Sequence, residues 1–208
     1  MSKVKYLVIA VLMGISLTSE AQYSQLGKKN EFMLKVEAGY APFMGNVGES
    51  GSYGFYISDF HNAANANVMA GLNISQDWFV GVGAGFNYFH NLKHEHVDPL
   101  MGVNFFADMD FRPIWKAIMG LDYQPSSIKW APMLGVRAGG SMLMGKSETY
   151  GTTFTPMAEV YAGVNWYYWY AFNGMRNMTR NWHSFYVTIG VAYMQQAVFL
   201  PIRLGWRW

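Results

Sequence analysis

The C-terminal stretch Val198–Trp208, VFLPIRLGWRW, alternates strictly between two kinds of side chain. A period of two residues is the period of a β-strand, whose successive side chains point to opposite faces. One face is wholly apolar, and the other carries both arginines. The apolar set is Val198, Leu200, Ile202, Leu204, Trp206 and Trp208, and the opposite set is Phe199, Pro201, Arg203, Gly205 and Arg207. Because free chain ends usually fray, a terminal tryptophan predicts that another strand holds this end.

The same alternation recurs in seven earlier stretches, which makes eight predicted strands. They cover residues 32–40, 65–74, 78–87, 101–110, 134–139, 158–166 and 184–193. Each strand has one face without charges, while glycine and most of the polar residues fall on the other. Strands of about ten residues with this pattern are typical of a transmembrane β-barrel. In lipid every backbone polar group must be paired, so such a sheet closes on itself and leaves no edge.

The sequence therefore predicts an all-β fold, an eight-stranded antiparallel transmembrane β-barrel in which the last strand pairs with the first. Aromatic residues at the predicted strand ends would form girdles at the membrane interfaces. These residues are Trp78, Tyr88, Trp130, Trp166, Tyr168, Trp206 and Trp208. The alternative fold is a soluble β-sandwich, whose strands also alternate. A sandwich would place its charges outside, and it would not need strand-end aromatics, a signal sequence and a terminal tryptophan together.

The composition supports a membrane barrel. Of the 208 residues, 51% are hydrophobic and only 13% are charged, whereas ordinary soluble domains carry about 25% charged residues. The formal net charge of +2, without any basic run, argues against nucleic-acid binding. Since the sequence contains no cysteine, disulfides, Cys-based zinc sites and lipoprotein-type lipidation are excluded.

The N-terminus has the layout of a secretory signal peptide. The basic start Met1–Lys5 precedes an apolar run of twelve residues, and the small residues Ser19 and Ala21 follow. We expect cleavage after Ala21, which divides the chain into a signal peptide, residues 1–21, and an outer-membrane barrel, residues 22–208. The alternative is an N-terminal transmembrane anchor, which needs about 20 apolar residues.

Three segments carry a resemblance to known proteins. The ending RLGWRW resembles the C-terminal recognition signal of bacterial outer-membrane proteins, and the plan of Phe32–Trp208 resembles the small barrels of the OmpX and OmpA transmembrane-domain type. The start ending in SEAQ is similar to signals common in Bacteroidota. The resemblance implies a bacterial outer membrane, periplasmic termini and assembly by the barrel-insertion machinery. The implied partners are outer-membrane lipids and lipopolysaccharide, with other outer-membrane proteins or lipoproteins as further candidates.

Periplasmic termini would also fix the connections. The outward loops would be Phe43–Ala63, Phe89–Asp98, Leu143–Thr155 and the Gln195–Gln196 turn, and the inward turns would be Ser75–Asp77, Arg112–Lys129 and Trp169–His183. Two of the inward turns are long for a barrel. They are either interfacial decoration or a docking surface for a partner, to which Arg176 and Arg180 would contribute.

The interior is predicted to be plugged and polar. An eight-stranded barrel is just wide enough for its own side chains. Four basic and four acidic residues fall on inward faces: Lys35, Arg137, Arg203, Arg207, Glu37, Asp108, Asp110 and Glu159. Because an unpaired buried charge is costly, we expect ion pairs across the lumen. The inward glycines Gly81, Gly83 and Gly85 would make room for these long side chains. Such a network either fills the barrel or acts as a salt-bridge gate.

Several short motifs match the sequence patterns of known binding sites but lack the secondary structure that those sites need. Gly140–Ser147 fits the P-loop pattern, and Gly81–Gly85 suggests a dinucleotide loop, but no helix is expected after either. The segment HNLKHEHVD groups His90, His94, His96 and Asp98 in a predicted outward loop. These side chains suit either a divalent metal or a solvated loop, and their spacing matches no established motif. We assign no metal or cofactor.

The sequence predicts no catalytic residue. The only His–Ser neighbours are His183 and Ser184, whose side chains point to opposite faces of a strand. The lipid A deacylase family resembles this chain in size and strand count, but its His-x-Ser pattern is not found here. The predicted function is a structural or accessory-subunit role in a larger outer-membrane assembly. The alternative is a surface enzyme or metal-binding barrel that uses His61, His90, His94 and His96, and a channel is a third interpretation.

Overall fold

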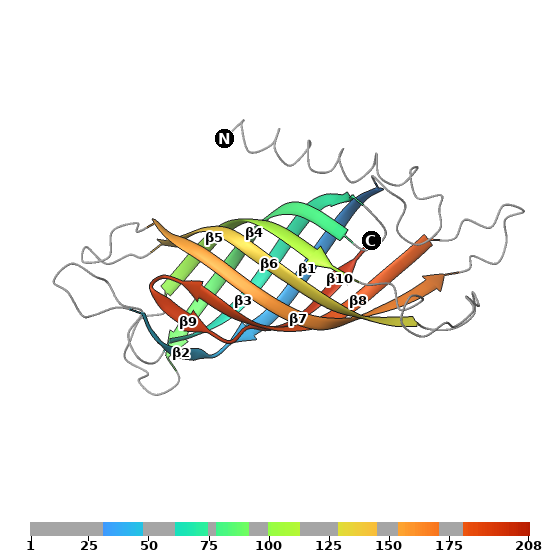
Figure 1. Ribbon diagram of the computed structural model, residues 1–208. Coiled ribbons are helices and arrows are strands. Elements are labelled where there is room, and N and C mark those ends of the chain that lie inside the picture. Colours follow the sequence, from blue (N-terminus) through green and yellow to red (C-terminus); the bar gives the residue numbers. More distant parts are fainter. Residues whose placement is uncertain are drawn as a thin grey trace, which may run out of the picture.

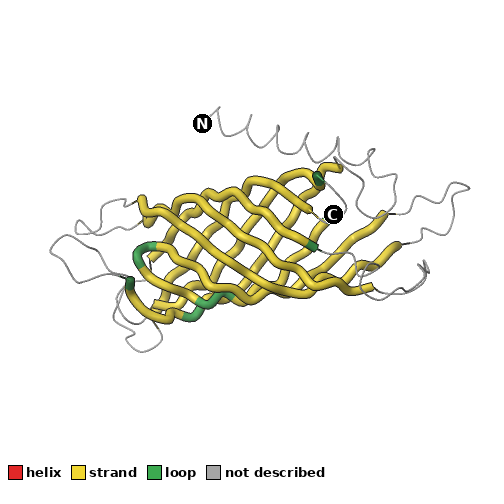
Figure 2. Tube along the Cα trace, in the orientation of Figure 1, coloured by secondary structure: helices red, strands yellow, loops and turns green. Residues whose placement is uncertain are grey.

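The computed structural model describes residues 31–47, 61–74, 78–91, 100–112, 129–144, 154–170 and 181–208. These residues form ten β-strands. Their bounds are β1 Glu31–Ala41, β2 Phe43–Asn46, β3 His61–Asn73, β4 Trp78–Asn91, β5 Leu100–Phe111, β6 Lys129–Met144, β7 Phe154–Tyr170, β8 Asn181–Met194, β9 Ala197–Phe199 and β10 Ile202–Arg207. Because β2 continues β1 beyond Pro42 and β10 continues β9 beyond Pro201, the ten strands make eight crossings of one wall (Figure 1, Figure 2).

The sheet closes into a barrel. Its order is β10-β1-β3-β4-β5-β6-β7-β8-β9-β2, with β8 also paired to β10, and every pairing is antiparallel. The first and last crossings pair from Lys35 opposite Arg207 to Tyr40 opposite Ile202, and β2 pairs with β9. This confirms the predicted all-β, eight-stranded antiparallel barrel.

The chain end is held by the first strand, as the sequence predicts. The amide of Leu34 donates to the carbonyl oxygen of Trp208 at 2.9 Å, and the amide of Trp208 donates to the carbonyl of Leu34 at 3.1 Å. We call this end of the barrel, where Glu31 and Trp208 lie, the terminal end. The opposite end, where the Gln195–Gln196 turn joins β8 to β9, is called the hairpin end (Figure 1).

The two faces of the wall follow the predicted alternation. On the outer face Val82 is 68% exposed and Leu204 is 60% exposed, whereas Arg207 on the inner face is 1% exposed. The barrel thus places its charged side chains inside and mostly apolar side chains outside, which is the reverse of a soluble fold. Within the described ranges, no helix is long and apolar enough to cross a membrane.

Strand boundaries differ from the prediction because pairing continues beyond the clearest alternation. β2 and the start of β3 lie within the predicted loop Phe43–Ala63, and β4 extends to Asn91. At the other end, β6 begins at Lys129, and β7 and β8 include parts of the predicted turn Trp169–His183. Near the rims the alternation is less regular, but the backbone groups still pair with a neighbouring strand.

The alternation also gave no sign of one irregularity, a register shift between Phe43 and Gly45 where β2 meets β9. Met44 is the extra residue of this bulge. The predicted signal peptide and the central parts of the predicted loops and turns lie outside the described residues, except for the Gln195–Gln196 turn, which is described.

Candidate functional site: an ion-pair network in the lumen

The lumen contains a network of buried charges at its centre. All eight charged residues that the sequence places inward are at most 4% exposed: Lys35, Glu37, Asp108, Asp110, Arg137, Glu159, Arg203 and Arg207. Strand pairing brings several of them side by side, because Lys35 is opposite Arg207 and Arg137 is flanked by Asp108 and Glu159. The predicted inward charges are therefore confirmed, residue by residue.

Arg137 is the centre of the network. Its Nη2 lies 2.6 Å from Oε1 of Glu37, and its Nε lies 2.8 Å from Oδ1 of Asp108. Its Nη1 lies 3.7 Å from Oε2 of Glu159. The guanidinium of β6 thereby connects β5 and β7, its neighbours in the sheet, to β1 on another part of the wall. The planar fork of arginine, with five N–H donors, suits such a junction.

A second group of contacts lies toward the terminal end, around Asp110. Lys35 Nζ lies 2.7 Å from Asp110 Oδ2 and also contacts Asp108. Arg207 Nη2 lies 2.9 Å from the same Asp110 oxygen. Toward the hairpin end, Arg203 pairs with Glu159 and donates from Nε to Asn65 Oδ1 at 3.0 Å. The carboxylates are shared between cations rather than paired one to one.

Arg112, which was predicted to lie in a turn, also belongs to this network. Arg112 is 2% exposed and follows the last residue of β5. Its Nε lies 2.7 Å from Asp110 Oδ1, and its Nη2 donates to Asn73 Oδ1 at 2.7 Å. The signal was available, because Arg112 continues the alternation that runs through Asp108 and Asp110. The nine charged residues named so far form what we call the ion-pair network.

Neutral side chains complete the hydrogen bonding. Tyr161 donates from its hydroxyl to Asp108 Oδ1 at 2.9 Å, and Tyr186 donates to Glu37 Oε1 at 2.9 Å. Asn67 Nδ2 donates to Glu37 Oε2 at 3.3 Å. These polar groups were placed on the inward face by the alternation but were not predicted to bind the carboxylates. These hydrogen bonds depend on which strands face each other across the lumen, and the two-residue period of the sequence does not contain that information.

Aromatic rings border the cations. Lys35 Nζ lies 4.1 Å from the ring centroid of Phe79, and the guanidinium of Arg137 lies 4.6 Å from that of Tyr161. The guanidinium of Arg207 lies 5.0 Å from the ring of Tyr186. Cation–π attraction of this kind is stronger away from water. The network is thus held by ring faces as well as by carboxylates.

The role of the three named inward glycines differs from the prediction, although Gly39 does make room for Arg203. A Cβ atom at Gly81 would lie 2.6 Å from Phe79 Cζ, one at Gly83 would lie 2.5 Å from Met69 Cγ, and one at Gly85 would lie 2.0 Å from Asn67 Oδ1. These three glycines therefore make room for an aromatic ring, a thioether chain and an amide, and not for the charged side chains.

An apolar layer closes the lumen on the hairpin side of the network. Its buried members are Ala41, Ala63, Met69, Phe89, Leu100, Phe106, Leu143, Met157, Met194, Ala197 and Phe199. Phe199 packs against Phe89 and Phe43, with ring centroids 5.9 Å apart in both pairs. The prediction of a polar lumen thus holds for the centre of the barrel, whereas this end combines the apolar layer with a few buried polar side chains, among them Ser141, Thr155 and Gln195. Leucines, methionines and phenylalanines on inward faces are its sequence signal.

The other predicted site residues do not gather into a site. His90 lies on the outer face of β4, while His94, His96 and Asp98 lie outside the described residues. His61 and His183 lie in strands, but their side chains are outside the described set, and Ser184 is 2% exposed. Among the described residues, no group of three or more His, Asp or Glu side chains is arranged to hold a metal ion.

The glycine motifs lie in strands. Gly140–Met144 is part of β6, and Gly81–Gly85 lies within β4. Residues 145–147, including the lysine of the P-loop pattern, lie outside the described residues. Neither described segment has the loop-to-helix geometry that cradles a phosphate.

Together the ion-pair network and the apolar layer occupy the lumen. An eight-stranded barrel is just wide enough for its own side chains, and those of the two layers are at most 7% exposed. The chain is a closed, eight-stranded β-barrel.

The comparisons with known proteins add likenesses of fold. No protein-family model and no curated protein matches the sequence. Among solved structures, the chain is similar to the N-terminal β-barrel domain of Pseudomonas aeruginosa OprF at 12% identity and a TM-score of 0.45, over 86% of this chain and 98% of that one. It is also similar to Neisserial surface protein A at 15% identity and a TM-score of 0.46, over 85% and 95% of the two chains.

The attachment invasion locus protein Ail of Yersinia pestis shows 16% identity and a TM-score of 0.36, over 87% of this chain and 100% of that one. At these identities and TM-scores no function is carried over to this chain.

Proposed function

We propose that this chain is an integral β-barrel of a bacterial outer membrane, with both termini in the periplasm. The support comes from the outer wall, where Phe154 is 68% exposed and Val160 is 64% exposed. In water such a wall would be strongly unfavourable, because burial of apolar surface drives folding by about 25 cal/mol per Å². Lipid hydrocarbon removes this penalty, and the closed sheet leaves no unpaired strand edge in the membrane. The predicted signal peptide agrees with export.

The role that fits the interior best is a structural one, as an accessory subunit of a larger outer-membrane assembly rather than as a passive pore or an enzyme. The observation that supports this proposal is the filled lumen, in which Arg137 binds three carboxylates from three strands. Removing one partner of a buried ion pair costs about 3–5 kcal/mol. Opening a pore through the network would separate several pairs at once. The proposed partners are outer-membrane lipids, lipopolysaccharide, and other outer-membrane proteins or lipoproteins.

Orientation can be tested with single cysteines, because the sequence contains none. Gln196→Cys lies in the exposed turn at the hairpin end, and Ile74→Cys lies next to β3 at the terminal end. We expect a membrane-impermeant maleimide to label Gln196→Cys in intact cells and Ile74→Cys only after the outer membrane is permeabilised. The opposite labelling pattern would contradict periplasmic termini.

The role itself needs two measurements. Purified protein in planar bilayers should give no steady ion conductance, and sustained single-channel steps would contradict a closed barrel. A mild-detergent pull-down of the tagged protein from native outer membranes, analysed by mass spectrometry, should recover stoichiometric partners. Recovery of the barrel alone would refute the subunit role and leave a solitary structural barrel.

A further inference from the structure

A proline interrupts the hydrogen bonding where the first and last crossings of the barrel meet. Because Tyr40 is opposite Ile202 and Phe43 is opposite Phe199, the same register places Pro42 opposite Leu200. The amide of Leu200 donates to the carbonyl oxygen of Pro42 at 2.9 Å. Residues in such a pair normally exchange two bonds, but proline has no N–H and returns none.

A second proline does the same on the other side of the last crossing. The amide of Gly190 in β8 donates to the carbonyl oxygen of Pro201 at 2.9 Å, and Pro201 has no N–H to return. The last crossing thus loses one ladder bond on each side, at the successive residues Leu200 and Pro201. Proline inside a sheet is confined to edges and bulges, and a bulge follows here between Phe43 and Gly45.

The short strand β2, Phe43–Asn46, lies at the hairpin end beyond this interruption (Figure 1). The ladder between β1 and β3 ends with Ala41 opposite Ala63, and among the described strands β2 pairs with β9 alone. Toward β3, the amide of Phe43 donates to the side-chain oxygen of Asn62 at 3.0 Å. One side of β2 is therefore held by a side chain in place of a ladder.

The part of the seam on the terminal side of the prolines is held more firmly. Lys35 and Arg207 are opposite each other across the seam, and both bind Asp110. Nε of Arg203 lies 4.0 Å from Oε2 of Glu37, again across the seam. β2 and β9 contain no ionisable residue, so ion pairs join the two crossings on the terminal side only.

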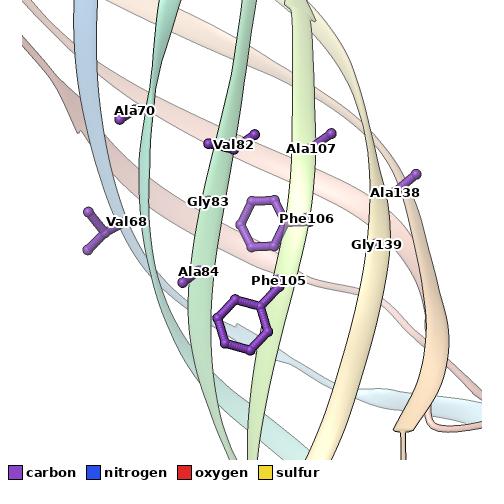
Figure 3. A pocket seen from close by; sticks show the side chains of 10 residues that line it. All are labelled: Val68, Ala70, Val82, Gly83, Ala84, Phe105, Phe106, Ala107, Ala138 and Gly139. Carbon is purple, nitrogen blue, oxygen red and sulfur yellow. The ribbon is translucent and has the colours of Figure 1, made fainter.

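The strands β3 to β6 are paired without such a break. Figure 3 shows a hollow of about 570 Å³ on these strands, lined only by valine, alanine, glycine and phenylalanine residues. The ladder between β3 and β4 keeps one register from Asn73 opposite Phe79 to His61 opposite Asn91. The next two ladders are equally continuous. The hollow is therefore a depression left by small side chains and not an interruption of the wall.

We propose that β2 is a strap, which swings away from β9 about Pro42 and Pro201 while the remainder of the barrel stays closed. Local opening of this kind takes place where few hydrogen bonds and contacts resist it. Opening separates the ring of Phe43 from that of Phe199 and uncovers the apolar layer at the side of the barrel. The ion-pair network stays intact, because its residues in β1 and β10 lie on the terminal side of the prolines.

Amide hydrogen exchange of the full barrel in detergent micelles, followed by NMR, tests the strap. The amide of Val47 donates to the carbonyl oxygen of Gln196 at 2.9 Å, so this bond and that of Leu200 both break when the strap opens. We expect the two amides to exchange about tenfold faster than the slowest amides of β3 between Ala63 and Ala66, in an unbroken ladder. Equal rates would overturn the proposal.

Pro42→Ala supplies the N–H that the carbonyl of Leu200 lacks. It should slow exchange of the Leu200 and Val47 amides about tenfold, because the strap then has an unbroken ladder beside it. Pro156→Ala is the matched control, since Pro156 lies in β7 at the same end of the barrel and away from the seam. It should leave both rates unchanged. Unchanged rates in Pro42→Ala, or equal slowing in Pro156→Ala, would contradict opening at the seam.

A single cysteine provides a second measurement. Ala197 is fully buried and lies opposite Asn46 of the strap, whereas Ala192 is fully buried in β8 and faces no part of β2. N-ethylmaleimide should label Ala197→Cys about tenfold faster than Ala192→Cys, and adding Pro42→Ala should remove most of this difference. Equal labelling of the two cysteines would refute the strap. Neither measurement depends on which side of the membrane the hairpin end occupies, so the strap and the proposed function can fail separately.

Discussion

Gly205 of β10 lies directly opposite Tyr186 of β8, and the tyrosine ring occupies the space that a side chain at position 205 would need. A Cβ atom at Gly205 would lie 2.2 Å from Tyr186 Cζ. The same relationship links Gly135 of β6 with Tyr161 of β7, where the corresponding distance is 2.1 Å. In both pairs the glycine allows the ring to lie flat against the wall while its hydroxyl reaches a carboxylate of the ion-pair network.

Gly205→Ala should therefore displace the Tyr186 ring and break its hydrogen bond to Glu37. We expect a loss of about 1–3 kcal/mol in the free energy of unfolding, as for other overpacked cores. Urea titration of the barrel in lipid vesicles, followed by tryptophan fluorescence, measures this loss. Tyr186→Phe is the comparison, because it removes the hydroxyl alone and with it a hydrogen bond to a carboxylate, at a cost of about 1.5–3 kcal/mol. Equal stability of Gly205→Ala and the unmodified protein would contradict the packing argument.

Arg137→Gln should be the most damaging single change in the network. It leaves Glu37, Asp108 and Glu159 without their shared cation, and a broken buried pair costs about 3–5 kcal/mol. The same urea titration measures the effect. The double variant with Glu37→Gln should recover part of the loss, because one stranded carboxylate becomes neutral. If the double variant instead loses as much stability as the two single variants together, Arg137 and Glu37 are not coupled.

The Gln195–Gln196 turn offers a stabilising change. Both residues have positive φ values, 54° and 60°, a conformation that glycine adopts more easily than residues with a side chain. Gln196 is exposed, so Gln196→Gly should raise the free energy of unfolding by about 1 kcal/mol.

Gln195→Gly provides the comparison. Gln195 is buried, and its Nε2 donates to Ser141 Oγ at 3.0 Å. Its replacement relieves the same backbone strain but loses this hydrogen bond, so its net effect should be smaller or destabilising. A larger gain at position 195 than at position 196 would refute this assignment of roles.

The last residue is expected to act mainly through its backbone. Deleting Trp208 removes both hydrogen bonds to Leu34, whereas Trp208→Ala retains them. Refolding yield into vesicles, read as the heat-modifiable band, should fall more for the deletion than for the substitution. The reverse order would assign the effect to the indole ring and the membrane interface instead.

The alternation of apolar and polar residues was sufficient to predict the barrel and the eight central charges. A strand has only two faces, and a face turned to lipid has to be apolar, so the charged residues fall on the inner face. The alternation did not reveal which inward residues meet across the lumen. Glu37 and Tyr186 are 149 residues apart in sequence, and their contact depends on closure and stagger of the sheet. The apolar layer around Phe89 and Phe199 was missed for a related reason. The pattern shows that both rings face inward, but their height along the barrel follows from the register of every intervening strand.

The network also constrains the order of events when the protein enters a bilayer. Lys35 and Glu37 lie in the first strand, but their partners follow in β5, β6 and β10, and Glu37 precedes Arg137 by 100 residues. A strand that crossed the hydrocarbon alone would expose unpaired charges, at about 2–4 kcal/mol for each Lys or Arg at the midplane. Insertion strand by strand is therefore unfavourable for this chain. We therefore expect the strands to associate before they cross the hydrocarbon, so that their charges enter it already paired with one another.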